Sequence, residues 1–446
     1  MRDASRKQTD ILRHITEAGF GSMLMGFGFA HLLSARTRAL LQRTDDRLGD
    51  SQALARLLTD LGPGFVELAR IMAPRSDIIP QKYQNMLFNL TYYPMRRRGV
   101  LKGISLRRAF GRAAKDICYI ESADTAGTPV AQQYHAVCED GRRMVVLLHD
   151  RRALERLEQN SDQIRWMLDH VLSRIDSAHQ LIWGSIWEEF QSRVRSLVDL
   201  RIAASDMHTL REQFDGVGKI VVPKVYWQYT NQHAMSFERV MQPCFDDIAL
   251  DRHAGAVSKK YVARYLFDLF ARQYGVTGHF LVRPRSSALQ VGKQNKIYLA
   301  QPLLIGIVPP EERQRLALCL YALAKGDDKT ASKAMLSLSY ERQHEDHYKH
   351  AGFRPYRHEE GTLSELFWAL LERAWSGHLH VPLSCSLVAE SLTYLEHAVA
   401  RIDEEVDVAD GMRVAIQKYV PTIFGTAKQA TLKTIASAVL NPTVSS

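Results

Sequence analysis

The sequence has no closely spaced cysteines, no long apolar run and no low-complexity segment. Its five cysteines lie far apart without a CxxC pair, which is typical of a reducing compartment and argues against a disulfide framework. The most apolar stretch, Phe20–Leu33, is too short to span a bilayer, and neither a secretory signal nor an apolar anchor near the C-terminus is visible. We therefore expect a cytoplasmic protein without a membrane-spanning segment.

Acidic side chains are missing from residues 92–115, the most basic part of a 446-residue chain whose net charge is +9. Such a run is most often a solvated face, and binding to membrane phosphates or another polyanion is the second interpretation. Nucleic-acid recognition is the third, but aromatic residues are not interleaved with the charges as stacking on single strands requires. The basic residues are Arg96, Arg97, Arg98, Lys102, Arg107, Arg108, Arg112 and Lys115.

Residues 9–43 are predicted to be helical, and two interpretations of their apolar part stay open. Met23, Met25 and Phe27 belong to a flexible apolar surface that either packs as a helical hairpin on the main domain or contacts a membrane surface.

Hydrophobic patterning predicts helices, then a block of strands, a loop-rich middle and helices again. A hairpin with an Asp140-Gly141 turn is expected within residues 117–148. We expect no regular element over residues 401–446. The other expected elements are helices over 152–214, strands over Ile220–Trp227 and Met235–Val240, a helix over Val257–Tyr274, strands and loops over 277–306, and helices over 311–400.

One stretch, from Leu61 to Tyr83, combines a capped helix with a proline-bound turn. Gly62-Pro63 breaks the preceding helix and starts the next one, whose apolar face includes Phe65 and Ile71. The order of residues resembles the signature of the UbiB/AarF (ADCK-type) atypical kinase family, a KxGQ motif followed by an Arg-x-Asp-x-x-Pro turn. The turn is intact as Arg75, Asp77 and Pro80, whereas Glu67, Ala69 and Arg70 replace the lysine, glycine and glutamine.

The resemblance implies an α+β, mostly helical, two-lobed protein-kinase-like fold with an N-terminal helical extension. It covers residues 10–425. The expected domains are the extension over 1–60, the signature helices and basic segment over 61–115, an N-lobe-like part over 116–243, a helical C-lobe-like part over 244–430 and a tail over 431–446.

Phosphoryl transfer on this fold needs a strand lysine held by a helix acid. The resemblance places the lysine at Leu147 and the acid at Leu197, and Asp199 keeps the second acid of a Glu-x-Asp motif. Losing one member of a buried Lys–Glu pair costs about 3–5 kcal/mol, whereas replacing both members costs little. Two leucines therefore indicate a coordinated replacement, and we expect their side chains to touch.

The catalytic loop and the metal ligands of the family are replaced as well. By resemblance, Arg283 stands for the catalytic aspartate, Ala288 for the metal-binding asparagine and Gln301 for the metal-binding aspartate. No carboxylate remains at these positions to hold Mg²⁺. We therefore expect no metal and no cofactor.

The segment that matches the family's nucleotide loop is also altered. Ala126, Gly127 and Thr128 form a vestige of the alanine-rich loop, and the following Pro129 lacks a backbone N–H that a phosphate cradle would use.

A histidine-rich stretch, HEDHYKH, offers another candidate site at His344, His347 and His350. Three-residue spacing places two histidines on one helix face, as metal ligands require, but the HExxH pattern of a metalloprotease is absent. A polar surface loop is the main interpretation, and a metal site is the alternative.

The sequence thus predicts a catalytically silent UbiB-like pseudokinase at a membrane surface, peripheral at the inner membrane. It would act as a scaffold or as a lipid- or isoprenoid-binding accessory factor linked to isoprenoid quinone or lipid metabolism, with an anionic membrane surface, a lipid or isoprenoid ligand and a protein as partners. Nucleic acid is not expected. The alternative is a divergent ATPase or phosphotransferase that relies on Asp199, Glu238 or the pair Arg283 and Arg285.

Overall fold

The computed structural model divides into two compact units, each described here by itself. Unit 1 comprises residues 1–109, 120–134 and 147–198, and unit 2 comprises residues 110–119, 135–146 and 199–446. The described residues are 51–73, 103–123, 128–173, 177–216, 218–245, 258–283, 288–300, 304–339 and 361–440, together with Arg13, Ile15, Ile79, Tyr83, Gln84, Met86, Leu87 and Leu90.

Several expected features lie outside the described residues. These are the continuous helical region over 9–43 and the turn at Arg75, Asp77 and Pro80. The expected domain boundaries stay predictions.

Unit 1 contains the helices α4 (Ser51–Leu61), α5 (Pro63–Met72), α8 (Arg151–Leu172) and α9 (Ser177–Val198), and α5 packs against both α8 and α9. The predicted helix break is confirmed: Gly62 has a φ of 121° and Pro63 is the first residue of α5. Val66 and Ala69 of α5 pack with Leu87 and Leu90 in a small buried cluster.

The side chain of Asn160 holds this helix break from α8. Its Nδ2 donates to the carbonyl of Leu61 at 3.0 Å, and its Oδ1 accepts from the backbone N–H of Gly64 at 3.1 Å. Asn160 is 1% exposed, so both hydrogen bonds form away from water. They satisfy backbone groups that the end of one helix and the start of the next leave without helical partners.

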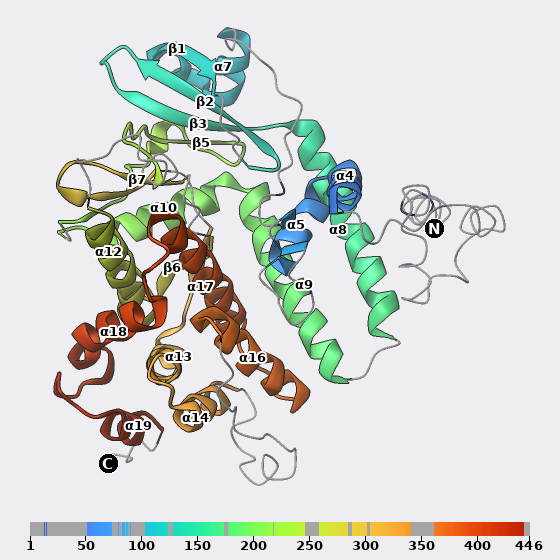
Figure 1. Cartoon of the computed structure of the whole chain (residues 1–446). Coiled ribbons are helices and arrows are strands. Elements are labelled where there is room, and N and C mark those ends of the chain that lie inside the picture. The colour runs from blue at the N-terminus through green and yellow to red at the C-terminus, as the bar shows by residue number, and fades with distance from the viewer. Residues whose placement is uncertain are drawn as a thin grey trace, which may run out of the picture. The chain divides into compact units, whose positions relative to one another are not determined.

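The predicted strands of residues 117–148 are confirmed as β1 (Ile117–Ser122), β2 (Ala131–Cys138) and β3 (Arg143–His149), preceded by α7 (Gly103–Phe110). They belong to a four-stranded sheet of order β1-β2-β3-β5, in which β5 is Ala234–Glu238 (Figure 1). Gly141 turns the β2–β3 hairpin with a φ of 79°, a conformation that glycine adopts without steric cost.

Unit 2 also carries two small sheets. In one, β4 (Ile220–Val221) pairs in parallel with β8 (Ile297–Leu299), which pairs antiparallel with β7 (Leu289–Val291); in the other, β6 (His279–Leu281) pairs with β9 (Ile305–Ile307). The strand expected over Ile220–Trp227 is wrong beyond Val221. Pro223 has no backbone N–H for a strand ladder, and Trp227 begins a short 3₁₀ helix.

The remaining helices of unit 2 include α18 and α19, which form where the hydrophobic pattern indicated no regular element, although α18 lies inside the helical part expected over 244–430. Asp407 caps α18, and buried Met412, Ile416 and Val420 line the helix. The helices are α10 (Leu200–Gln213), α12 (Lys259–Arg272), α13 (Pro310–Leu323), α14 (Asp328–Leu338), α16 (Leu363–Ser376), α17 (Leu383–Ile402), α18 (Val408–Phe424) and α19 (Leu432–Leu440).

Within the described ranges, no helix combines the length and the apolar character needed to cross a membrane.

Gly64→Ala is expected to lower the free energy of unfolding by roughly 1–3 kcal/mol, because the new Cβ would lie 2.5 Å from the Cβ of Asn160. Gly184→Ala is the matched control, since nothing lies within 4 Å of its added Cβ. That change should raise stability by roughly 0.5–1 kcal/mol through helix propensity alone. Urea denaturation of both variants measures the difference, and equal effects of the two changes would contradict the packing at Gly64.

Burial raises the pKa of the Asp206 carboxyl on α10 from 3.8 to about 6. The folded state therefore binds this proton more tightly than the unfolded state, so the associated stability is present near pH 4 and is lost as pH rises through 6. Asp206→Asn should raise the free energy of unfolding at pH 7 by about 1–2 kcal/mol and have little effect at pH 4. Urea denaturation at both pH values tests this, with the exposed Asp215→Asn as control; equal gains at both pH values would contradict it.

Candidate functional site

A buried ion pair occupies the position that the family resemblance gives to the catalytic aspartate. The Nε of Arg283, just after β6, donates to Oε1 of Glu390 on α17 at 2.8 Å. The side chains of Arg283 and Glu390 are 8% and 1% exposed, so the charges compensate each other away from water. Arginine stays protonated in proteins, so Arg283 offers neither a metal ligand nor a general base.

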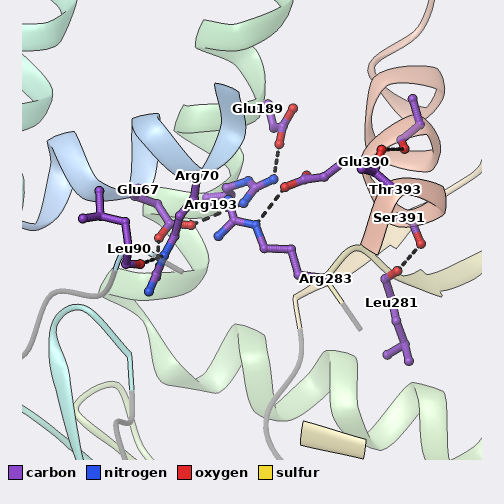
Figure 2. Close-up of polar contacts among 11 residues, drawn as sticks. Glu67, Arg70, Leu90, Glu189, Arg193, Leu281, Arg283, Glu390, Ser391 and Thr393 are labelled. Carbon is purple, nitrogen blue, oxygen red and sulfur yellow. Dashed lines mark hydrogen bonds and ion pairs between the residues drawn. The ribbon is translucent and has the colours of Figure 1, made fainter. Parts of the chain in front are cut away.

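Neighbouring hydrogen bonds fix α17 beside β6. The hydroxyl of Ser391 donates to the carbonyl of Leu281 (Figure 2). It also accepts from the hydroxyl of Tyr274 at 2.8 Å. Tyr274 is fully buried, and desolvation raises the pKa of its phenol well above the usual range. The backbone on each side of the Arg283–Glu390 pair is thus held in place.

A second buried ionic cluster replaces the family's KxGQ chemistry in unit 1. Each carboxylate oxygen of Glu67 meets one guanidinium: Arg70 lies at 3.2 Å and Arg193 of α9 at 3.3 Å. Arg193 also pairs with Glu189 one turn earlier on α9, and Arg70 donates to the carbonyl of Leu90 at 2.9 Å (Figure 2). The two carboxylates and the two guanidinium groups therefore neutralise each other's charge in a buried environment.

The two leucines that the resemblance places at the lysine and acid positions belong to unit 1. Leu147 is 1% exposed on β3. Leu197 packs on the cluster of Val130, Ala153 and Leu157. The backbone carbonyl of Leu197 lies 2.8 Å from Nε2 of His149, two residues beyond Leu147. A direct contact between the two leucine side chains stays a prediction.

The other catalytic positions have local structural contacts. Ala288 is 3% exposed, and its carbonyl accepts from the N–H of Ala300 at 3.0 Å. Asp199 caps α10 by accepting from the N–H of Arg201, and it also binds the guanidinium of Arg201. Gln301 lies outside the described residues.

The remaining candidates for a nucleotide or metal are only partly described. Thr128 forms an isolated β-bridge with Ala131, whereas Ala126 and Gly127 lie outside the described residues. The three histidines His344, His347 and His350 lie outside them as well. In the part of the chain that the structure covers, no group of three or more His, Cys, Asp or Glu side chains could hold a metal ion.

Arg107, Arg108 and Arg112 are exposed on α7 and on the 3₁₀ helix that follows it, as is Lys115. The part of this segment that belongs to unit 2, from Phe110 onward, is anchored at Tyr229, which is 1% exposed. The Tyr229 ring meets Phe110 edge to face, and its hydroxyl donates to Asp116 at 3.2 Å. The rest of the predicted basic surface, Arg96, Arg97, Arg98 and Lys102, lies outside the described residues.

Sequence reasoning missed Glu189, Arg193 and Glu390. A signal for the first two exists, because an acid and a base four residues apart on an apolar helix can pair along it. Glu390 is an acid within the apolar first half of α17, and such an acid indicates a buried partner. Nothing local names that partner, since Arg283 lies 107 residues away.

Comparison with known proteins supports the resemblance. Residues 111–335 match the model of the ABC1 atypical kinase-like domain. An uncharacterized protein of Synechocystis is 24% identical over 380 residues, 78% of this chain and 89% of that protein. A probable protein kinase UbiB of Xylella fastidiosa is 26% identical over 222 residues, and the chloroplast protein Activity of BC1 Complex Kinase 8 of Arabidopsis thaliana is 24% identical over 285 residues.

The matches cover 48% and 62% of this chain, but only 40% of the UbiB protein and 37% of the Arabidopsis protein. A solved structure from Mycobacterium tuberculosis, described as the complex of Rv3197 with erythromycin, has a TM-score of 0.50 at 12% identity and covers 87% of this chain and 98% of that chain. The predicted α+β, mostly helical, kinase-like fold is confirmed. This chain belongs to the family of ABC1 atypical kinase-like proteins, whose relatives include the UbiB proteins.

Proposed function

We propose that this chain is a catalytically silent member of its family that works as a scaffold or a lipid- or isoprenoid-binding accessory factor at a membrane surface. Its link to isoprenoid quinone or lipid metabolism rests on the UbiB resemblance. Fold alone does not determine activity, so the proposal depends on the individual side chains.

The observation that carries the proposal is the Arg283–Glu390 ion pair. A kinase-like site needs a carboxylate at this position to orient the acceptor hydroxyl. Here a guanidinium stands in that place, and its positive charge is used to neutralise a carboxylate that is 1% exposed. Removing either charge would leave the other buried without compensation. The pair therefore stabilises the fold, and Arg283 is not available to a substrate.

The Glu67 cluster and the two leucines support the same conclusion from unit 1. A Glu67 carboxylate in place of the motif's lysine repels polyphosphate, and both its oxygens are engaged by Arg70 and Arg193. Leu147 and Leu197 cannot form the ion pair that contacts nucleotide phosphates in active relatives of this fold. Leu147 and Leu197 thus stand where the resemblance expects charged side chains. Glu67 stands where it expects a lysine, and its charge is neutralised by the two arginines.

The exposed basic segment supplies the interaction surface of the proposal. Arg107, Arg108 and Arg112 are exposed, and Asp116 and Phe110 fix the segment at Tyr229. Basic side chains held at a surface are attracted to anionic lipid headgroups. A protein partner and a lipid or isoprenoid ligand belong to the same proposal.

Mg-ATP, ADP and a non-hydrolysable ATP analogue at millimolar concentration are expected to leave the melting temperature unchanged, because the charges that bind phosphate and metal are replaced. A nucleotide present at 100 times its dissociation constant would add about 2.7 kcal/mol to the free energy of unfolding. A metal-dependent shift would instead favour the divergent ATPase. That alternative also predicts Mg²⁺-dependent ATP turnover lost in Asp199→Ala.

Arg283→Met is expected to lower the free energy of unfolding by about 3–5 kcal/mol, because the carboxylate of Glu390 would remain buried without its partner. Combining it with Glu390→Leu should recover most of that loss, since neither charge then remains. Chemical denaturation of the single and double variants measures the coupling. Arg413→Met is the control, because its pair with Asp410 is exposed and should contribute less than about 1 kcal/mol. A single variant as stable as the control would contradict the buried pair.

A further inference from the structure

Three segments of unit 2 that are far apart in the sequence bring lysines together on one surface. They are residues 218–227, 258–267 and 288–300, and none of them contains an acidic residue. Six of their seven basic side chains, all except Lys224, form what we call the lysine surface: Lys219, Lys259, Lys260, Arg264, Lys293 and Lys296.

Polar and ring contacts hold the three segments together. The ammonium of Lys219 donates to the carbonyl of Gln294 at 3.0 Å and lies 5.6 Å from the ring centre of Tyr265 on α12. The backbone N–H of Ser258, which precedes α12, donates to the side chain of Asn295 at 3.2 Å. The β7–β8 turn, the start of β4 and the first turns of α12 therefore meet at one place.

The β7–β8 turn has the backbone conformation of a tight hairpin. Gln294 and Asn295 both have positive φ values, 60° and 57°, as the two central residues of a tight hairpin turn require. Such values are sterically costly for residues other than glycine. The turn presents Lys293 and Lys296 on either side of these two residues.

The first turn of α12 adds charges where helix electrostatics disfavour them. Lys259 and Lys260 are the first two residues of the helix, and its first turn has no acid. The partial positive charge of a helix N-terminus favours anions and opposes cations. The lysine surface therefore gathers positive charge, which an external anionic surface would attract.

We propose that the lysine surface docks onto an anionic lipid bilayer. Five of its six cations are lysines, which are depleted at protein–protein interfaces, where arginine is enriched. Tyr261, which is 53% exposed beside Lys260, has the amphipathic ring that settles at the level of lipid headgroups. This inference rests on the proposed membrane-surface role and adds a site separate in sequence from the basic segment at Arg107–Arg112.

Sedimentation with vesicles tests the proposal. The full chain is mixed with vesicles of phosphatidylglycerol and phosphatidylcholine, or of phosphatidylcholine alone. Lys260→Gln combined with Lys293→Gln removes two exposed charges, one from α12 and one from the turn. Each lysine near an anionic membrane contributes about 1 kcal/mol, so the double variant should bind phosphatidylglycerol vesicles roughly 30-fold more weakly.

Two controls separate the site from net charge and from misfolding. Lys329→Gln combined with Lys333→Gln makes the same change of charge at exposed positions of α14 and should bind nearly as the unaltered chain does. Lys260→Arg combined with Lys293→Arg keeps the charge and should retain binding. Near-UV circular dichroism of each variant checks that the fold is kept.

The outcomes distinguish this site from the wider proposal. If the unaltered chain fails to bind phosphatidylglycerol vesicles, both this inference and the membrane-surface role are wrong. If it binds and the Lys260/Lys293 double variant binds equally well, only the lysine surface is overturned. The lysine surface would also be overturned as a membrane site if the Lys260/Lys293 double variant kept its binding to vesicles but lost binding to duplex DNA or to an acidic peptide. That result would assign the surface to another partner.

Discussion

A charge buried away from water is tolerated only where an opposite charge or a hydrogen-bond partner meets it, and each unit of this protein is arranged around one such case. In unit 1, Glu67 is held between Arg70 and Arg193, which ties α5 to α9. In unit 2, Arg283 and Glu390 tie the end of β6 to α17. The family resemblance assigns Arg283 to the catalytic aspartate and Glu67 to the lysine of the KxGQ motif.

The replacements form a consistent physical pattern. An active site keeps charges imperfectly neutralised so that substrate and metal complete them. Here Glu67, Arg193, Arg283 and Glu390 pair with opposite charges within the protein, and Leu147 is buried. The proposed catalytic silence would follow from this internal pairing within the ABC1 frame. Positive charge is instead found on exposed surfaces, where it is available to an external anionic partner.

The sequence predicted the local elements better than the long-range pairings. The Gly62-Pro63 break and the Asp140-Gly141 turn depend on the backbone preferences of those residues, so they could be read directly. Helices α18 and α19 were missed because their short apolar stripes are stabilised by packing on α12, α13 and α14, which no local pattern reveals. The family resemblance singled out Arg283, but its partner Glu390 is 107 residues away and could not be named from the sequence.

The hydrogen bonds of Asn160 also restrict how the length of α8 can change. Asp150 caps the start of α8, and Asn160 lies ten residues further along, where its amide faces Leu61 and Gly64. Each residue of an α-helix turns the next side chain by about 100°. Inserting or deleting one residue between Asp150 and Asn160 would rotate the amide away from the helix break. That part of α8 should therefore tolerate substitutions at exposed positions but not a change in its number of residues.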